Sequence, residues 1–71
     1  MFKDDFLKEV LIVAFLDPFK IQSDFARLRS QEVAALASLG FISTLEAPGV
    51  YGRKWRITGV GIDKLRDLGA L

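Results

Sequence analysis

Proline and glycine divide this chain into segments of the length of single helices and strands. Pro18, Gly40 and the Pro48-Gly49 pair interrupt the apolar patterns of a sequence that is only 71 residues long. Proline removes a backbone donor, and glycine favours turns and left-handed helix ends, so each of these positions is an expected element boundary. A chain of this length has room for one domain, which we expect to span residues 1–71.

The spacing before Gly40 predicts three helices. Apolar residues recur three and four apart over residues 3–16, with charged residues on the opposite side. The apolar second half of this segment also fits a strand, and periodicity alone leaves that alternative open. Ser23 is placed to cap a brief helix over residues 24–28. Ser30 is placed to cap a third helix that ends at Gly40.

The spacing after Gly40 predicts a hairpin and a last helix. Polar and apolar residues alternate over 41–46 and again over 53–58, around a turn-rich loop at 47–52. In the second strand this places Trp55 inward together with Ile57. The last helix is expected to begin after the cap residue Thr58 and to end before Gly69. Ile62, Leu65 and Leu68 share one stripe on it, and Gly61 allows close approach to the sheet.

The amino-acid composition excludes most of the side chains that enzymes use for catalysis. The chain has ten Lys and Arg against nine Asp and Glu, a formal net charge of +1, and it contains neither cysteine nor histidine. Disulfides, thiolate nucleophiles, imidazole bases and the usual zinc ligands are therefore absent. Asp63 and Asp67 share a helix face, but cations flank them. We expect no catalytic residues, no metal site and no cofactor, and hence a protein that is not an enzyme.

The apolar residues are too scattered to span a membrane. The longest apolar run is Val10 to Leu16, and a transmembrane helix needs about 20 such residues. Asp17 and Pro18 follow this run in place of the small-residue cleavage site of a secretory signal. We therefore expect a cytoplasmic protein that does not bind membranes. Since 51% of the residues are hydrophobic, we also expect a homodimer, formed by this run and by the stripe Leu65, Leu68 and Leu71.

Two stretches carry a resemblance to a known superfamily. The first reads Leu36-Ala37-Ser38-Leu39-Gly40-Phe41-Ile42, and the second reads Gly52-Arg53-Lys54-Trp55-Arg56-Ile57-Thr58-Gly59-Val60-Gly61. They resemble the helix-to-strand junction and the second wing strand of winged helix-turn-helix regulators, in particular the MarR-like and PadR-like families. The resemblance covers about residues 23–68. It implies a compact α+β winged helix, in the order helix, short helix, helix, β-hairpin wing, helix. The opening Ser-Asp-Phe-Ala-Arg is also similar to small regulators encoded by phages and prophages.

The resemblance implies that the third helix enters the major groove of DNA. At 100° per residue, Gln31, Ala35 and Ser38 face outward, with Glu32 toward one flank. Gln31 is the expected base contact, together with Ser38 and with Ser30 at the helix start. An ordinary solvated helix face is the alternative. The segment before Val33 is shorter than the usual helix-turn-helix and lacks its turn glycine, which leaves the docking geometry of this helix open.

Positive charge brackets the third helix. Between residues 27 and 56, five cations oppose only Glu32 and Glu46, a net charge of +3. The expected phosphate contacts are Arg27, Arg29, Arg53, Lys54 and Arg56. Tyr51 is expected as an exposed aromatic in the wing loop, and this loop is expected to reach the neighbouring minor groove. A tyrosine that folds back on the wing is the alternative for this residue. The alternative is a strand that shows its charged side to water.

The sequence therefore predicts a DNA-binding protein, a transcriptional regulator or architectural factor related to phages or prophages. The partner is double-stranded DNA. A protein-interaction module on the same scaffold, such as an adaptor or an inhibitor of a host protein, is the alternative. The cation-free third helix and the surplus of apolar residues favour that alternative.

Overall fold

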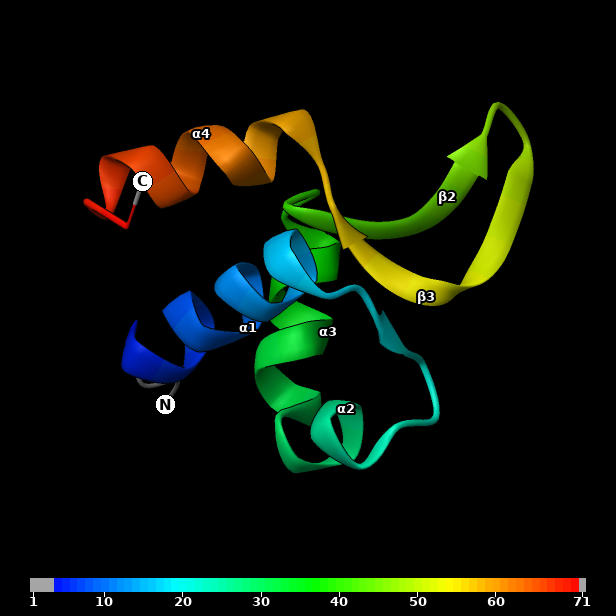
Figure 1. The fold of residues 1–71 in the computed structure, drawn as a ribbon, viewed down its shortest axis with the longest axis horizontal. Coiled ribbons are helices and arrows are strands. Elements are labelled where there is room, and N and C mark those ends of the chain that lie inside the picture. The colour runs from blue at the N-terminus through cyan, green and yellow to red at the C-terminus, as the bar shows by residue number, and fades with distance from the viewer. Residues whose placement is uncertain (1–3, 71) are drawn as a thin grey trace.

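Helix α1 (Asp4–Leu16) lies in the middle of the molecule. It packs against helix α3 (Ser30–Ser38), helix α4 (Gly59–Asp67) and strand β3 (Val50–Ile57) (Figure 1). The computed structural model describes residues 4–70, and in it α1 is helical throughout, so the strand alternative for its second half is wrong. The buried apolar side chains of the core are Val10, Leu11, Ala14, Phe19, Ala26, Val33, Leu36, Ile42 and Leu65.

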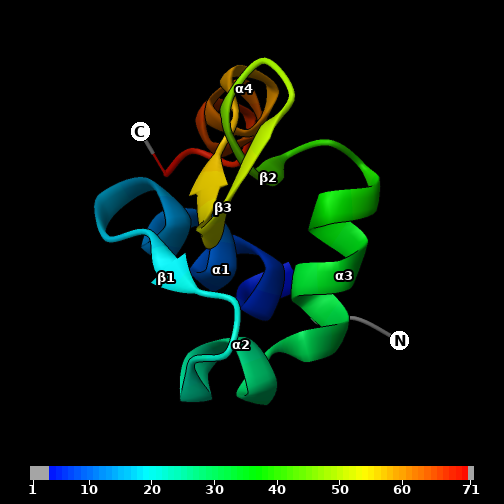
Figure 2. The ribbon, with the colours of Figure 1, turned by 90° about the vertical axis from the view of Figure 1, so that its right-hand side faces the viewer.

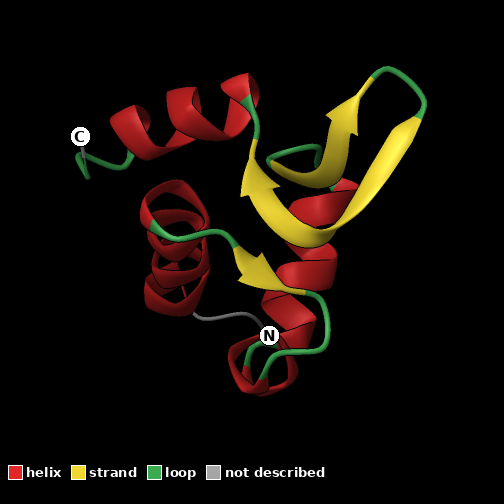
Figure 3. Cartoon of the chain, turned by 45° about the vertical axis from the view of Figure 1, so that its right-hand side comes forward, coloured by secondary structure: helices red, strands yellow, loops and turns green. Residues whose placement is uncertain are grey.

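A three-stranded antiparallel sheet lies beside this helical body. Strand β2 (Ile42–Ala47) and β3 form a hairpin, and β1 (Phe19–Lys20) pairs with the other edge of β3, giving the strand order β1-β3-β2. The hairpin projects from the helices, whereas the short β1 lies along the base of β3 (Figure 3). The sequence patterns did not predict β1. They did predict the hairpin.

The hairpin extends further than the alternation indicated. The expected loop at 47–52 is mostly strand, and the turn itself is reduced to Pro48-Gly49, where Gly49 has a φ of +75°. Two register shifts in β2, between Ser43 and Leu45 and between Leu45 and Ala47, disturb the pairing. These irregularities and the lack of a side chain at Gly52 obscure a period of two.

Short polar side chains begin two of the helices. Ser23 caps helix α2 (Asp24–Leu28), because its Oγ accepts a hydrogen bond from the Ala26 N–H at 3.2 Å. The expected cap at Ser30 is wrong. Arg29 alone joins α2 to α3 and occupies both cap positions, so Ser30 is already the first residue of α3. Because Arg29 is the only residue between the two helices, Ser30 cannot take the extended backbone conformation of a cap residue.

The start of α4 is bound to the junction of α3 and β2. Thr58 caps α4 as predicted, with its Oγ1 accepting from the Gly61 N–H at 3.0 Å and donating to the Gly40 carbonyl at 2.6 Å. A Cβ at Gly61 would collide with the carbonyl oxygen of Phe41, which confirms the predicted close approach. Gly40 has a φ of +79°, in agreement with its expected role at the end of α3.

The architecture is therefore α+β, with four helices and one antiparallel sheet over residues 4–70. No helix in this range combines the length and the apolar character needed to cross a bilayer. Two predictions concern residues outside the described range. They are the start of the first helix at Lys3 and the part of Leu71 in the proposed dimer stripe.

Candidate nucleic-acid interface

The polar face of α3 is exposed. Ser30, Gln31 and Ser38 are all accessible, so the residues expected to meet bases are free to do so. Glu32 is only 8% exposed and is buried together with Val33 and Leu36, rather than at a flank of the outer face. Because the buried side of α3 includes Glu32, the outer face is turned slightly, and Ala34 replaces Ala35 on it. This face therefore presents hydroxyl and amide groups without an acid.

Arg29 is held inside the protein. Its Nε donates to Oε1 of Glu9 at 2.7 Å, and its guanidinium carbon lies 3.8 Å from the centroid of the Phe6 ring. The Arg29 side chain is only 17% exposed. The pair joins α1 to the junction of α2 and α3, so Arg29 orients that junction and offers little surface to a phosphate.

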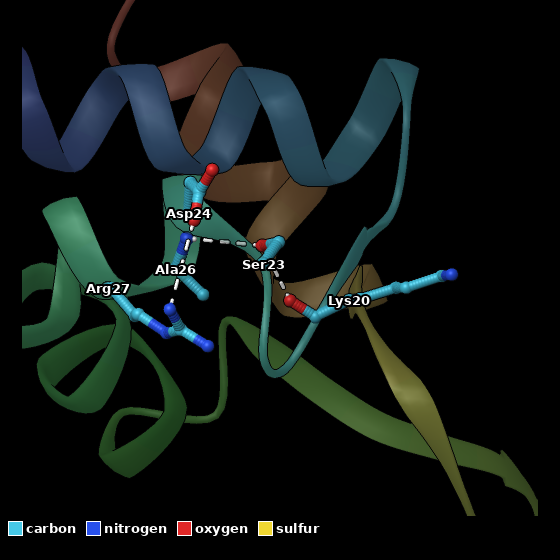
Figure 4. A network of polar contacts seen from close by, with 5 residues as sticks. All are labelled: Lys20, Ser23, Asp24, Ala26 and Arg27. Atoms are coloured by element: carbon cyan, nitrogen blue, oxygen red, sulfur yellow. Dashed lines mark hydrogen bonds and ion pairs between the residues drawn. The ribbon is translucent and has the colours of Figure 1, made fainter.

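Arg27 lies on the surface of α2. Its Nη1 is 3.8 Å from Oδ1 of Asp24, and both side chains are largely solvated (Figure 4). Exposed ion pairs of this kind contribute about 0–1 kcal/mol and exchange partners readily. Arg27 therefore remains accessible to another anion.

On the hairpin, Arg56 has an acidic neighbour. The Glu46 carboxylate lies against the backbone at Gly52, where a Cβ would overlap it, and its Oε1 is 3.6 Å from Nη2 of Arg56. Both side chains are about half exposed. The absence of a side chain at Gly52 thus allows Glu46 to reach Arg56 across the hairpin.

Tyr51 is 72% exposed, in agreement with the sequence analysis. It lies in β3 opposite Leu45, and not in a loop. The inward positions of Trp55 and Ile57 are confirmed by their packing against the core. Lys54 and Arg56 are exposed, as alternation along the strand requires.

Arg53 and Lys54 are exposed and form no ion pair in the part of the chain that the structure describes. They line a hollow of about 670 Å³ with Lys20, Ile21 and Gln22. Lys20 was missed in the sequence analysis, because a strand of two residues is too short for a periodicity argument. The alternation Phe19-Lys20-Ile21-Gln22 after Pro18 is the signal that could have revealed it.

The five expected cations are thus divided. Seen from the side of the hairpin, β1 and α3 lie on opposite sides of α1, with α2 below them (Figure 2). Arg53 and Lys54 belong to the β1 side, and Arg29 and Arg56 are bound to carboxylates of the chain. The exposed polar face of α3 and the unpaired cations of β1 and β3 therefore lie on different sides of α1.

The carboxylates of α4 include one that forms an ion pair. Asp63, one of the two acids that share a face of α4, pairs with Arg66 at 3.5 Å. Within residues 4–70 no three His, Cys, Asp or Glu side chains gather as a metal site would require. Comparisons with protein-family models, curated proteins and solved structures return no significant match.

Proposed function

We propose that this chain is a small winged-helix protein that binds double-stranded DNA as a transcriptional regulator or architectural factor. The order of elements supports the assignment, because α2 and α3 are consecutive helices joined by one residue and β2 and β3 form a projecting hairpin, which is the layout of a winged helix. The observation that carries the proposal is the pair of hairpin cations, Arg53 and Lys54, that no carboxylate of residues 5–70 neutralises.

In the proposed complex α3 lies in the major groove. Gln31 hydrogen-bonds a base edge, and Ser30 and Ser38 contact neighbouring groups. The hairpin follows the backbone, with Tyr51 near the adjacent minor groove. Arg27 contributes a further phosphate contact, because its ion pair with Asp24 is weak. In this proposal the protein has no enzymatic activity, acts in the cytoplasm and is related to regulators encoded by phages or prophages.

Titration of labelled duplex DNA at several salt concentrations tests this function. Affinity should fall steeply with salt, and Arg53→Ala should reduce the slope of log K against log[salt] by about 0.9. Arg66→Ala is the matched control, since Arg66 lies on α4 and is paired with Asp63. An absence of duplex binding by the unmodified protein even at low salt would show that the proposed function is wrong.

A second candidate function is protein binding. A hollow of about 360 Å³ between α1, α3 and α4 is lined by Lys64 and by apolar residues that include Leu39, which is 64% exposed, and Leu68, which is 38% exposed. Exposed apolar surface of this kind is a feature of interaction modules. Affinity capture from host lysate after nuclease treatment separates the two functions, because a protein partner survives the nuclease and a DNA-mediated one does not.

The homodimer remains a prediction. The residues that suggested it are largely used within the chain, because Val10, Leu11, Ala14 and Leu65 are all buried in the core. Leu16 and Leu68 keep exposed surface. Sedimentation equilibrium at high protein concentration tests it, and a monomer there would remove it.

A further inference from the structure

The strongest unexplained feature of the molecule is a pair of lysines held opposite each other. The register of β1 on β3 sets Lys20 against Lys54, next to the pair of Phe19 and Trp55. Directly opposed residues of an antiparallel pair have Cβ atoms about 5 Å apart and project from the same face of the sheet. Like charges at such positions repel each other, and no acid of the described chain lies within ion-pair distance of either ammonium group.

The backbone fixes this arrangement although β1 has only two residues. The Lys20 carbonyl accepts from the Ser23 N–H at 3.0 Å and from the Ser23 hydroxyl at 2.7 Å (Figure 4). One residue later, the Ile21 N–H donates to the Arg53 carbonyl at 2.9 Å. Ser23 is also the cap of α2, so Lys20 is bound both to the sheet and to the start of that helix. The Lys20 side chain extends away from α2 in Figure 4.

The surroundings of the pair suit an anion with several oxygens. Arg53 precedes Lys54 and lines the same hollow from the other face of the strand, and Gln22 adds an amide. Lysine ammonium groups bind phosphate oxygens as point charges and need no fixed orientation. The lining contains no aromatic residue on which a base would stack. The hollow therefore fits a sugar-phosphate backbone better than a base or a free nucleotide.

We propose that Lys20 and Lys54 together bind a backbone phosphate of duplex DNA, with Arg53 beside them. This inference rests on the proposed function and extends the interface from the wing to the edge strand β1. The bound phosphate replaces the missing carboxylate and removes the repulsion between the two ammonium groups. Since no base is contacted, this site contributes equally to every DNA sequence.

The test uses the single variants Lys20→Gln and Lys54→Gln and the matched control Lys64→Gln, a surface lysine of α4. Duplex DNA of two unrelated sequences is titrated between about 50 and 200 mM salt. Because both lysines contact one phosphate, the double variant Lys20→Gln/Lys54→Gln should reduce the log-log slope by about 0.9. Each single variant should reduce the slope by less, and it should lower the affinity about threefold at the low-salt end, equally for both sequences. The control should leave both quantities unchanged. Thermal unfolding should show that Lys20→Gln is at least as stable as the unmodified protein, because the substitution relieves the repulsion.

A second measurement separates this site from the proposed function. Pyrophosphate added to the unmodified protein should shift the amide resonances of Lys20, Ile21 and Arg53, and Lys20→Gln should abolish the shift. If duplex DNA binds but the double variant Lys20→Gln/Lys54→Gln retains the full slope, the phosphate site is wrong and DNA binding stands. If duplex DNA does not bind but pyrophosphate still shifts these amides, the phosphate site stands and the proposed function is wrong. If duplex DNA does not bind and pyrophosphate shifts none of these amides, both the phosphate site and the proposed function are wrong.

Discussion

Two arginines that were expected to meet DNA are instead held by carboxylates of the chain, and the two contacts differ in strength. The Arg29 side chain is 17% exposed and lies 2.7 Å from Glu9, whereas that of Arg56 is 47% exposed and lies 3.6 Å from Glu46. Solvent and salt screen the second pair much more than the first. Arg56 can therefore exchange its carboxylate for a phosphate, and Arg29 has a structural role.

Replacing Arg29 tests that role. We expect Arg29→Ala to destabilise the protein by about 1–2 kcal/mol, because it removes a charge-assisted hydrogen bond to Glu9 and a cation–π contact with Phe6. The slope of duplex affinity against salt should not change at temperatures where the variant is folded. Urea denaturation and a salt titration measure the two effects. A slope reduced by about 0.9 with unaltered stability would instead identify Arg29 as a phosphate contact.

Replacing Glu46 should strengthen DNA binding. Glu46→Gln removes a negative charge from the hairpin and releases Arg56, so duplex affinity should rise about threefold at low salt, with a steeper salt dependence. Asp63→Asn is the matched control, because it changes the net charge equally and breaks the Asp63–Arg66 pair on α4. Fluorescence anisotropy compares the variants. Equal gains in both would indicate a general charge effect without involvement of the hairpin.

Among the elements, α4 depends on its close approach to the junction of α3 and β2. Gly61→Ala should destabilise the protein by about 1–3 kcal/mol, because the new Cβ would collide with the Phe41 carbonyl. In the same helix, Gly59→Ala meets no atom within 4 Å and should be neutral or stabilising by up to about 1 kcal/mol. Thermal unfolding should separate the two variants by several degrees. Similar melting temperatures would contradict the close packing.

The elements that the sequence predicted are those with a local signal. Ser23 and Thr58 marked helix starts through side chains that reach their own backbone, and Gly40 and Gly69 marked helix ends through left-handed conformations. The local signal for strand β1 is only a short alternation after Pro18, because the strand forms through pairing with β3, which lies more than thirty residues further along the chain. The failed cap at Ser30 also has a distant cause, since the tight junction at Arg29 is held by Glu9 on α1.

In the candidate site, too, only the features that depend on local sequence spacing could be predicted. Exposure of Gln31 and Lys54 follows from periods of 3.6 and two residues, which sequence spacing reveals, whereas Tyr51 was expected to be exposed in a loop. Whether a cation is paired with a carboxylate depends on residues that are distant in the sequence. Arg29 is twenty residues from Glu9, and Lys54 is brought to Lys20 only by the sheet. Composition and local charge cannot supply those pairings.

For the molecule as a whole, α1 is the helix against which α3, α4 and β3 pack. Leu11 is 1% exposed and belongs to a core shared with α3, β2 and α4. Leu11→Ala should cost about 2–5 kcal/mol, which is comparable to the entire stability expected of a domain of this size. The variant should therefore be largely unfolded at 37 °C by circular dichroism. Leu16→Ala on the same helix removes a side chain that is 71% exposed and should change stability by less than about 0.5 kcal/mol.

The irregular pairing of β2 also affects how copies of the protein behave when crowded. An outer strand with regularly spaced free N–H and C=O groups is a template on which a further chain can add, the first step toward fibrils. In β2 the two register shifts break that regular spacing, and Pro48 follows immediately after the strand. The opposite edge offers only two residues, one of them Lys20. Both margins of the sheet thus resist aggregation, so the hairpin can expose Leu45 and Val50 without recruiting strands from neighbouring molecules.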